Sequence, residues 1–216
     1  HNPIGFTVSD EIKLQLAKIL QEHQIYLIED DVYEELYYDH KKPLSMKYFD
    51  QQNLVLHCSS FSKTLGAGFR IGWVYAGKFS ENIQHLQLMS TLSVNPFIQN
   101  TLADYLSHRY YEKHLKTLRN TLKRLKNQYY QYLSKNLPDY CTVHYYPSGY
   151  FLWITLPEHI NSNMIYQEML QHNIGIASGA LFYRSDKSPH HLRINCSFEL
   201  NDNTLTALDL LIRLLK

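Results

Sequence analysis

Cysteine, net charge and long apolar runs are all scarce in this sequence of 216 residues. The three cysteines, Cys58, Cys141 and Cys196, lie far apart without a paired spacing, which argues against a zinc site and a disulfide framework and indicates a reducing cytoplasm. The formal net charge is +1 with neutral histidines, so overall charge indicates neither a nucleic-acid nor a membrane partner. No apolar run is long enough to cross a bilayer and no signal-peptide pattern is present at the start, so we expect a cytoplasmic protein.

Strand and helix signals alternate through the first ninety or so residues. Ser9 and Asp10 predict the start of a helix whose apolar face carries Ile12, Leu16 and Ile19. An apolar run over 25–28 reads as a buried parallel strand, and further strands are predicted over 53–57 and 70–75. This order predicts an α/β fold with a parallel or mixed sheet.

The second half of the sequence has a different pattern. One long helical stretch is predicted over 96–137, with apolar positions at Leu115, Leu118, Leu122, Leu125, Tyr129 and Tyr132. Beyond it we expect strands over 142–145, 150–156 and 174–177 and around Arg193, with helices over 163–172 and 205–215. The predicted organisation is a partial large domain over 1–94, an interdomain helical segment over 95–137 and a small α+β domain over 138–216.

The predicted long helix is also basic. Its lysines and arginines include Arg109, Lys113, Lys116, Arg119, Lys123, Arg124 and Lys126, with few acids between them. Such a stripe can contact nucleic-acid phosphates, but no groove-reading motif accompanies it, so we expect a solvated face. The histidines are scattered without metal-ligand spacing, and no metal site is predicted.

The run Ser59-Ser60-Phe61-Ser62-Lys63-Thr64-Leu65-Gly66-Ala67-Gly68-Phe69-Arg70 suits a ligand with both an aldehyde and a phosphate. The Lys63 amine can condense with a carbonyl to a Schiff base. The hydroxyls of Ser60 and Ser62 and the guanidinium of Arg70 are suitable phosphate ligands. A solvent-facing turn is the alternative for a bare Ser-x-Lys, because short motifs match by chance.

Two further charged residues stand in chemically informative places. Asp30 follows the first predicted strand, and ligands of open α/β sheets bind at the carboxyl ends of strands; an N-cap or turn aspartate is the alternative. Arg193 lies within an apolar strand pattern, where its guanidinium should have an anionic partner, either a ligand or a structural carboxylate.

The Lys63 segment resembles that of pyridoxal-phosphate enzymes of the aspartate aminotransferase fold type, which implies a fold-type-I architecture. Three other stretches resemble that family in the same order: His1-Asn2-Pro3-Ile4-Gly5, Ile28-Glu29-Asp30-Asp31-Val32-Tyr33 and His191-Leu192-Arg193-Ile194-Asn195-Cys196-Ser197. The resemblance implies pyridoxal 5'-phosphate as cofactor, with Asn2 and Tyr33 at its phenolic oxygen and Asp30 at its pyridine nitrogen. It also implies that Arg193 binds the α-carboxylate of an amino acid or 2-oxo acid.

Within this fold type, the motifs around Lys63, Arg70 and Arg193 and the run Gly149-Tyr150-Phe151-Leu152-Trp153-Ile154 resemble the effector domain of MocR-type GntR-family transcriptional regulators. That resemblance implies a sensed amino acid, a homodimer at full length, and DNA contact only through a preceding winged-helix domain. A free aminotransferase of the 2-aminoadipate type and an inactive fragment that serves as a dimerisation surface are the alternatives.

The resembled family has two cofactor elements upstream of its asparagine-proline turn, a glycine-rich loop and a stacking aromatic ring. This sequence begins at that turn. We therefore expect a truncated large domain, either as the carboxyl-terminal part of a longer protein or as a truncated relative.

Overall fold

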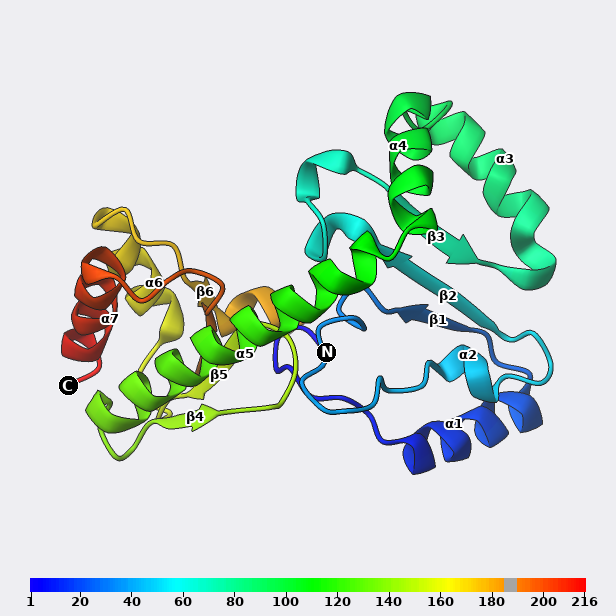
Figure 1. Ribbon diagram of the computed structural model, residues 1–216. Helices are drawn as coiled ribbons and strands as arrows, with labels where there is room; N and C mark the ends of the chain where they lie inside the picture. Colours follow the sequence, from blue (N-terminus) through cyan, green and yellow to red (C-terminus); the bar gives the residue numbers. More distant parts are fainter. Residues whose placement is uncertain (185–189) are drawn as a thin grey trace. The chain divides into compact units, whose positions relative to one another are not determined.

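The computed structural model describes residues 1–184 and 190–216. The chain divides into two units: unit 1 comprises His1–Thr7 and Arg119–Lys216, and unit 2 comprises Val8–Leu118. Figure 1 shows the helices and strands of both units, which are described separately below. The predicted division into stretches 1–94, 95–137 and 138–216 stays a prediction.

Unit 2 contains a three-stranded sheet in the order β1-β2-β3 (Figure 1). Strand β1 (Leu27–Asp30) pairs in parallel with β2 (Val55–Ser60), and β2 pairs antiparallel with β3 (Gly72–Tyr75). The predicted mixed α/β sheet is thus confirmed, although β2 runs to Ser60 rather than ending at residue 57. The helices are α1 (Asp10–His23), α2 (Met46–Phe49), α3 (Ser80–Thr91) and α4 (Pro96–Ser107), with short 3-10 turns at Phe61–Lys63, Ala67–Phe69 and Gly77–Phe79.

Helix α1 begins as predicted, with the Ser9 hydroxyl accepting a hydrogen bond from the Ile12 amide at 3.4 Å. The predicted buried face is wrong, because Ile12 and Ile19 are 56% and 49% exposed. The helix instead buries Lys13, Ala17 and Leu20, and the Lys13 amine donates to the Leu44 carbonyl. Ala17 and Leu20 form a small core with Met46 of α2, Val55 of β2 and Leu54, which directly precedes β2.

The single long helix predicted over 96–137 is two helices, α4 and α5 (Tyr110–Asn136). His108 between them is extended, with φ −105° and ψ 164°. The Ser107 hydroxyl donates to the Asp104 carbonyl at 2.7 Å, and His108 Nδ1 lies 2.8 Å from the same oxygen. Such local side-chain bonds compete with the helical hydrogen bond and explain the break.

Unit 1 has a four-stranded antiparallel sheet in the order β4-β5-β7-β6. Its strands are β4 (Thr142–His144), β5 (Phe151–Thr155), β6 (Ala177–Ser178) and β7 (His191–Asn195), and its helices include α6 (Ser162–Gln171) and α7 (Asp202–Leu214). A 3-10 turn covers Gly179–Phe182. Leu152 and Leu192 from the sheet and Leu133 and Leu211 from the helices are fully buried in one core. The predicted small α+β architecture is present here.

No helix of the described residues combines the length and apolar character needed to cross a membrane.

Candidate cofactor site

Lys63 lies in the 3-10 turn that follows the carboxyl end of β2. The 3-10 turn Phe61–Lys63 begins there, and the Ser60 hydroxyl caps it by accepting from the Ser62 amide at 3.4 Å. Lys63 is exposed, and its Nζ lies 5.8 Å from the centroid of the Tyr33 ring. The structure therefore brings the predicted lysine and tyrosine together beside the two serines.

Asp30 ends β1, the parallel neighbour of β2. Its Cα is in register with Cys58, and the Asp31 amide donates to the Cys58 carbonyl at 2.9 Å. Because parallel strands end at the same edge of a sheet, Asp30 and the Lys63 turn project from one edge. Asp30 is exposed, and Tyr33 lies in the turn that follows it, which is closed by a hydrogen bond from the Leu36 amide to the Tyr33 carbonyl.

Arg70 joins this edge through the loop before β3. It has left-handed backbone geometry with φ of 52°, and its Nη1 lies 3.4 Å from the Ala67 carbonyl. The Phe61 amide donates to the Ile71 carbonyl at 3.1 Å, which ties this loop to the lysine turn. At Gly72 an added Cβ would meet the Ser59 carbonyl at 2.8 Å, so only glycine allows β3 to approach β2 here.

Asn2 and Arg193 lie together in unit 1. Arg193 Nη1 donates to Asn2 Oδ1 at 2.5 Å. The guanidinium carbon lies 4.2 Å from the centroid of the Phe151 ring and 5.0 Å from that of Phe182, on neighbouring parts of the same unit. The peptide bond between Asn2 and Pro3 is cis.

The predicted site residues thus form two groups. One group lies in unit 2 and consists of Asp30, Tyr33, Ser60, Ser62, Lys63 and Arg70; the other lies in unit 1 and consists of Asn2 and Arg193. The roles assigned to these residues from the sequence stay predictions.

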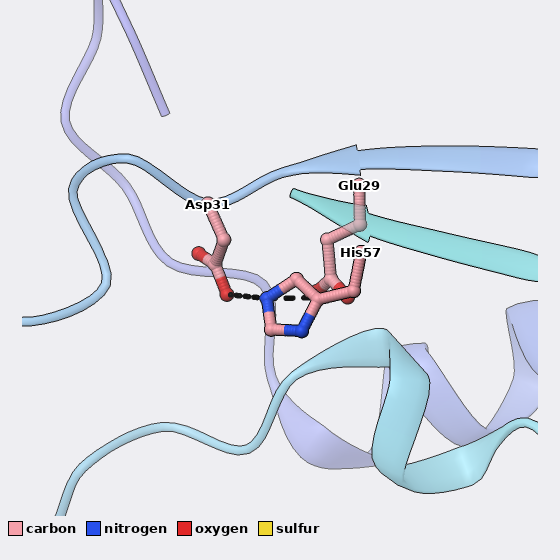
Figure 2. Close-up of side chains that lie close together, drawn as sticks. All are labelled: Glu29, Asp31 and His57. Atoms are coloured by element: carbon pink, nitrogen blue, oxygen red, sulfur yellow. Dashed lines mark hydrogen bonds and ion pairs between the residues drawn. The ribbon is translucent and has the colours of Figure 1, made fainter. Parts of the chain in front are cut away.

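Sequence reasoning missed a charged network on the other face of β1, shown in Figure 2. His57 Nε2 lies 3.1 Å from Asp31 Oδ2 and 4.0 Å from Glu29 Oε2. The hydrogen bond with Asp31, assisted by the nearby carboxylate charges, raises the pKa of His57 above its usual value. Alternation along β1 was the available signal, since Glu29 and Asp31 share the face opposite Asp30.

The network has the ligand types of a metal centre, and its three ligand atoms lie within 4.8 Å of one another. Glu29, however, also accepts hydrogen bonds from the backbone amides of Met46 and Lys47, at 2.6 and 3.2 Å. Its carboxylate therefore holds α2 against β1, and the raised pKa of His57 favours its charged form beside the two acids. This arrangement is accounted for as an ion-pair network that stiffens the strand ends.

The residues of the unit 2 group suit pyridoxal phosphate chemically. Two hydroxyls and one guanidinium are phosphate donors, an amine is available for the aldehyde, and a carboxylate is available for the ring nitrogen. The donor set therefore fits the predicted cofactor.

The mixed α/β sheet of unit 2 and the antiparallel sheet of unit 1 match the fold-type-I transferase architecture. The chain belongs to the aminotransferase class I and II family, whose sequence pattern matches residues 1–208.

The curated relatives include regulators of the helix-turn-helix (HTH) type, as the predicted resemblance required. The chain is 44% identical over 215 residues to the uncharacterized HTH-type transcriptional regulator YdcR of Escherichia coli, covering 100% of this chain and 46% of that protein. It is 30% identical over 208 residues to the uncharacterized HTH-type transcriptional regulator YjiR of the same organism, covering 96% and 44%. The chain thus spans about half the length of the curated relatives it matches.

Solved aminotransferase structures share the fold. A kynurenine aminotransferase of Pyrococcus horikoshii, solved with PMP and with KYN and KYA as substrates and products, matches with a TM-score of 0.90 and 26% identity, covering 99% of this chain and 53% of that one. LysN, an alpha-aminoadipate aminotransferase of Thermus thermophilus, matches in fold with a TM-score of 0.90 at 20% identity, covering 99% and 56%.

Proposed function

We propose that this chain is the aminotransferase-like effector domain of a transcriptional regulator, which holds pyridoxal phosphate through a Schiff base at Lys63 and senses an amino acid. The observation that carries the proposal is the 44% identity, over the whole chain, to a protein named as an HTH-type regulator. The placement of Lys63 in the 3-10 turn that follows β2 supports the choice of lysine.

Each residue has a definite task in this proposal. Ser60, Ser62 and Arg70 bind the phosphate, and Lys63 supplies the amine. Asp30 holds a proton on the pyridine nitrogen, and Tyr33 donates to the phenolic oxygen. The bound cofactor supplies an electron-withdrawing ring to an attached amino acid.

The unit 1 group completes the assignment. Asn2 donates its side-chain amide to the phenolic oxygen, and Arg193 binds the carboxylate of the amino acid or 2-oxo acid as a planar fork. Asn2 Oδ1 accepts from Arg193, so the two hydrogens of the Asn2 side-chain amide are not used in that contact. The regulator as a whole is a homodimer that contacts DNA through a helix-turn-helix domain outside these residues.

A free aminotransferase is the second candidate. It is supported by the 26% identity to the kynurenine aminotransferase, whose structure contains PMP. The two candidates differ in turnover, because an enzyme converts amino acid to 2-oxo acid repeatedly whereas a sensor retains it.

The test is covalent capture. The purified chain is mixed with excess pyridoxal phosphate, reduced with borohydride and digested, and the modified lysine is located by mass spectrometry. We expect the label at Lys63, with exposed Lys78 as the internal control. Labelling spread equally over Lys63 and Lys78 contradicts the assignment. Repeated release of 2-oxo acid from an amino-acid panel favours the enzyme, and binding without release favours the sensor.

A further inference from the structure

Lys126 is predicted from the sequence to belong to the solvated basic face of the long helix, and that prediction is wrong. The side chain lies on α5 with 0% exposure. Burial lowers the pKa of its amine to about 8. An ammonium in such a position is unfavourable unless its N–H groups have well-placed acceptors.

The acceptors belong to one turn between β4 and β5. Lys126 Nζ donates to the Tyr146 carbonyl at 2.8 Å and to the Ser148 carbonyl at 2.7 Å, and it lies 5.1 Å from the centroid of the Tyr145 ring. The Ser148 amide donates to the same Tyr146 carbonyl at 2.8 Å. One ammonium therefore draws two carbonyls of the turn toward a single point and sets its curvature.

The turn between β4 and β5 is hydrogen-bonded to the segment that carries Asn2. The Ser148 hydroxyl donates to the Gly5 carbonyl at 2.7 Å, and the Gly5 amide donates to the His1 carbonyl at 2.7 Å. Gly5 has φ of +92°, and a Cβ added there would lie 3.8 Å from Lys126 Nζ. The Asn2–Pro3 turn is thus closed by the hydrogen bond between Gly5 and His1, and Ser148 holds it close to the Lys126 ammonium.

We propose that Lys126 is a positioning residue that holds the Asn2–Pro3 turn so that Asn2 meets Arg193 as a preformed pair. The inference rests on the proposed function, which assigns Asn2 to the cofactor and Arg193 to the carboxylate. An apolar side chain would fill the same volume but would remove two donors from the Tyr146 and Ser148 carbonyls. The turn would lose its curvature, and Asn2 would lose its fixed distance to Arg193.

Hydrogen exchange of the intact chain, followed by mass spectrometry, tests the positioning role. The variants are Lys126→Met and Ser148→Ala, and Lys123→Met on the exposed face of α5 is the control. In both variants we expect amides of residues 2–6 to exchange roughly 3- to 10-fold faster, the effect of losing about one hydrogen bond. Ser148→Ala leaves the Lys126 ammonium in place, so in this variant we expect the amides of β5 and β7 to exchange as slowly as in the wild type. The test therefore stands even where Lys126→Met destabilises the whole of unit 1.

A second measurement links the turn to the site. Pyridoxal phosphate and then an amino-acid panel are titrated into each variant, and we expect Ser148→Ala to weaken the affinity of the loaded protein for the amino acid roughly 3- to 10-fold. Unchanged exchange of residues 2–6 in both variants, or an equal change in Lys123→Met, overturns the inference. Faster exchange with unchanged affinities overturns it too, because the turn would then not serve the site.

Failure of the proposed function has a separate signature. If the wild-type chain captures no pyridoxal phosphate, the proposed function fails, while the exchange data still decide whether Lys126 holds the Asn2–Pro3 turn.

Discussion

Replacing Arg70 and Arg193 with alanine, one at a time, should separate phosphate binding from carboxylate binding. Arg70 is exposed, and its Nη1 contact to the Ala67 carbonyl is long at 3.4 Å. Its left-handed φ of 52° costs alanine about as much as arginine. We therefore expect Arg70→Ala to change the free energy of unfolding by less than about 0.5 kcal/mol, so that its effect falls on the ligand.

The size of that effect follows from the contact that is lost. A charge-assisted hydrogen bond contributes about 1.5–3 kcal/mol, which corresponds to a roughly 10- to 150-fold weaker affinity. For Arg70→Ala this loss applies to pyridoxal phosphate. For Arg193→Ala it applies to the amino acid, with cofactor affinity kept within roughly 3-fold.

Arg193→Ala also removes structural contacts. The guanidinium lies over the Phe151 and Phe182 rings and donates to Asn2. Two such ring contacts contribute about 0.5–2 kcal/mol each, so we expect unit 1 to lose about 1–4 kcal/mol. A thermal melt of each variant separates this loss from the binding effect, with exposed Arg213→Ala as a control.

The assay is an absorbance titration with pyridoxal phosphate, followed by an amino-acid panel added to the loaded protein. Equal loss of cofactor affinity in Arg70→Ala and Arg193→Ala would refute the division of labour between the two arginines.

Three further outcomes are expected. Lys63→Ala should abolish the visible absorption of bound pyridoxal phosphate without altering the melt, and a band that persists would show that another lysine reacts. The hydrogen bond to Asp31 raises the pKa of His57 in the folded state. The stabilisation that charged His57 gives to the folded protein is therefore full below the unfolded pKa of about 6.5 and is lost as pH rises through the folded pKa. Urea midpoints of wild type and His57→Gln should therefore converge above that pKa, and a difference independent of pH would contradict the network. Leu152→Ala, at a fully buried position of β5, should cost about 2–5 kcal/mol of unfolding free energy, whereas a loss under about 1 kcal/mol would show a looser core than the structure has.

Several features of this protein follow from the sequence alone, because short segments determine them. Lys63 follows an apolar strand and Asp30 ends another. Both strands form, although each is displaced by two or three residues from its predicted bounds and Ile28 of the first is 72% exposed rather than buried. The apolar repeat of α5 buries Leu115, Leu122 and Leu125. Period and the order of elements along the chain are local properties, which is why they indicated an α/β fold; the family was indicated by the resemblance of the motifs around Lys63, Asp30 and Arg193.

Other features depend on which distant segments meet, and only the tertiary structure decides them. The register of β1 and β2 sets His57 opposite Glu29. Contacts with α2 and β2 determine which face of α1 is buried. The buried residues are Lys13, Ala17 and Leu20, each one position after a residue of the predicted face. Lys126 lies four residues after Leu122 and three before Tyr129, so its helical position is on the buried stripe, and the carbonyls of a turn some twenty residues away in the chain make its burial favourable. The helical period distinguishes this lysine from exposed Lys123, but the cost of burying its charge depends on partners that the local sequence does not contain, so only the tertiary structure shows which groups accept its hydrogen bonds.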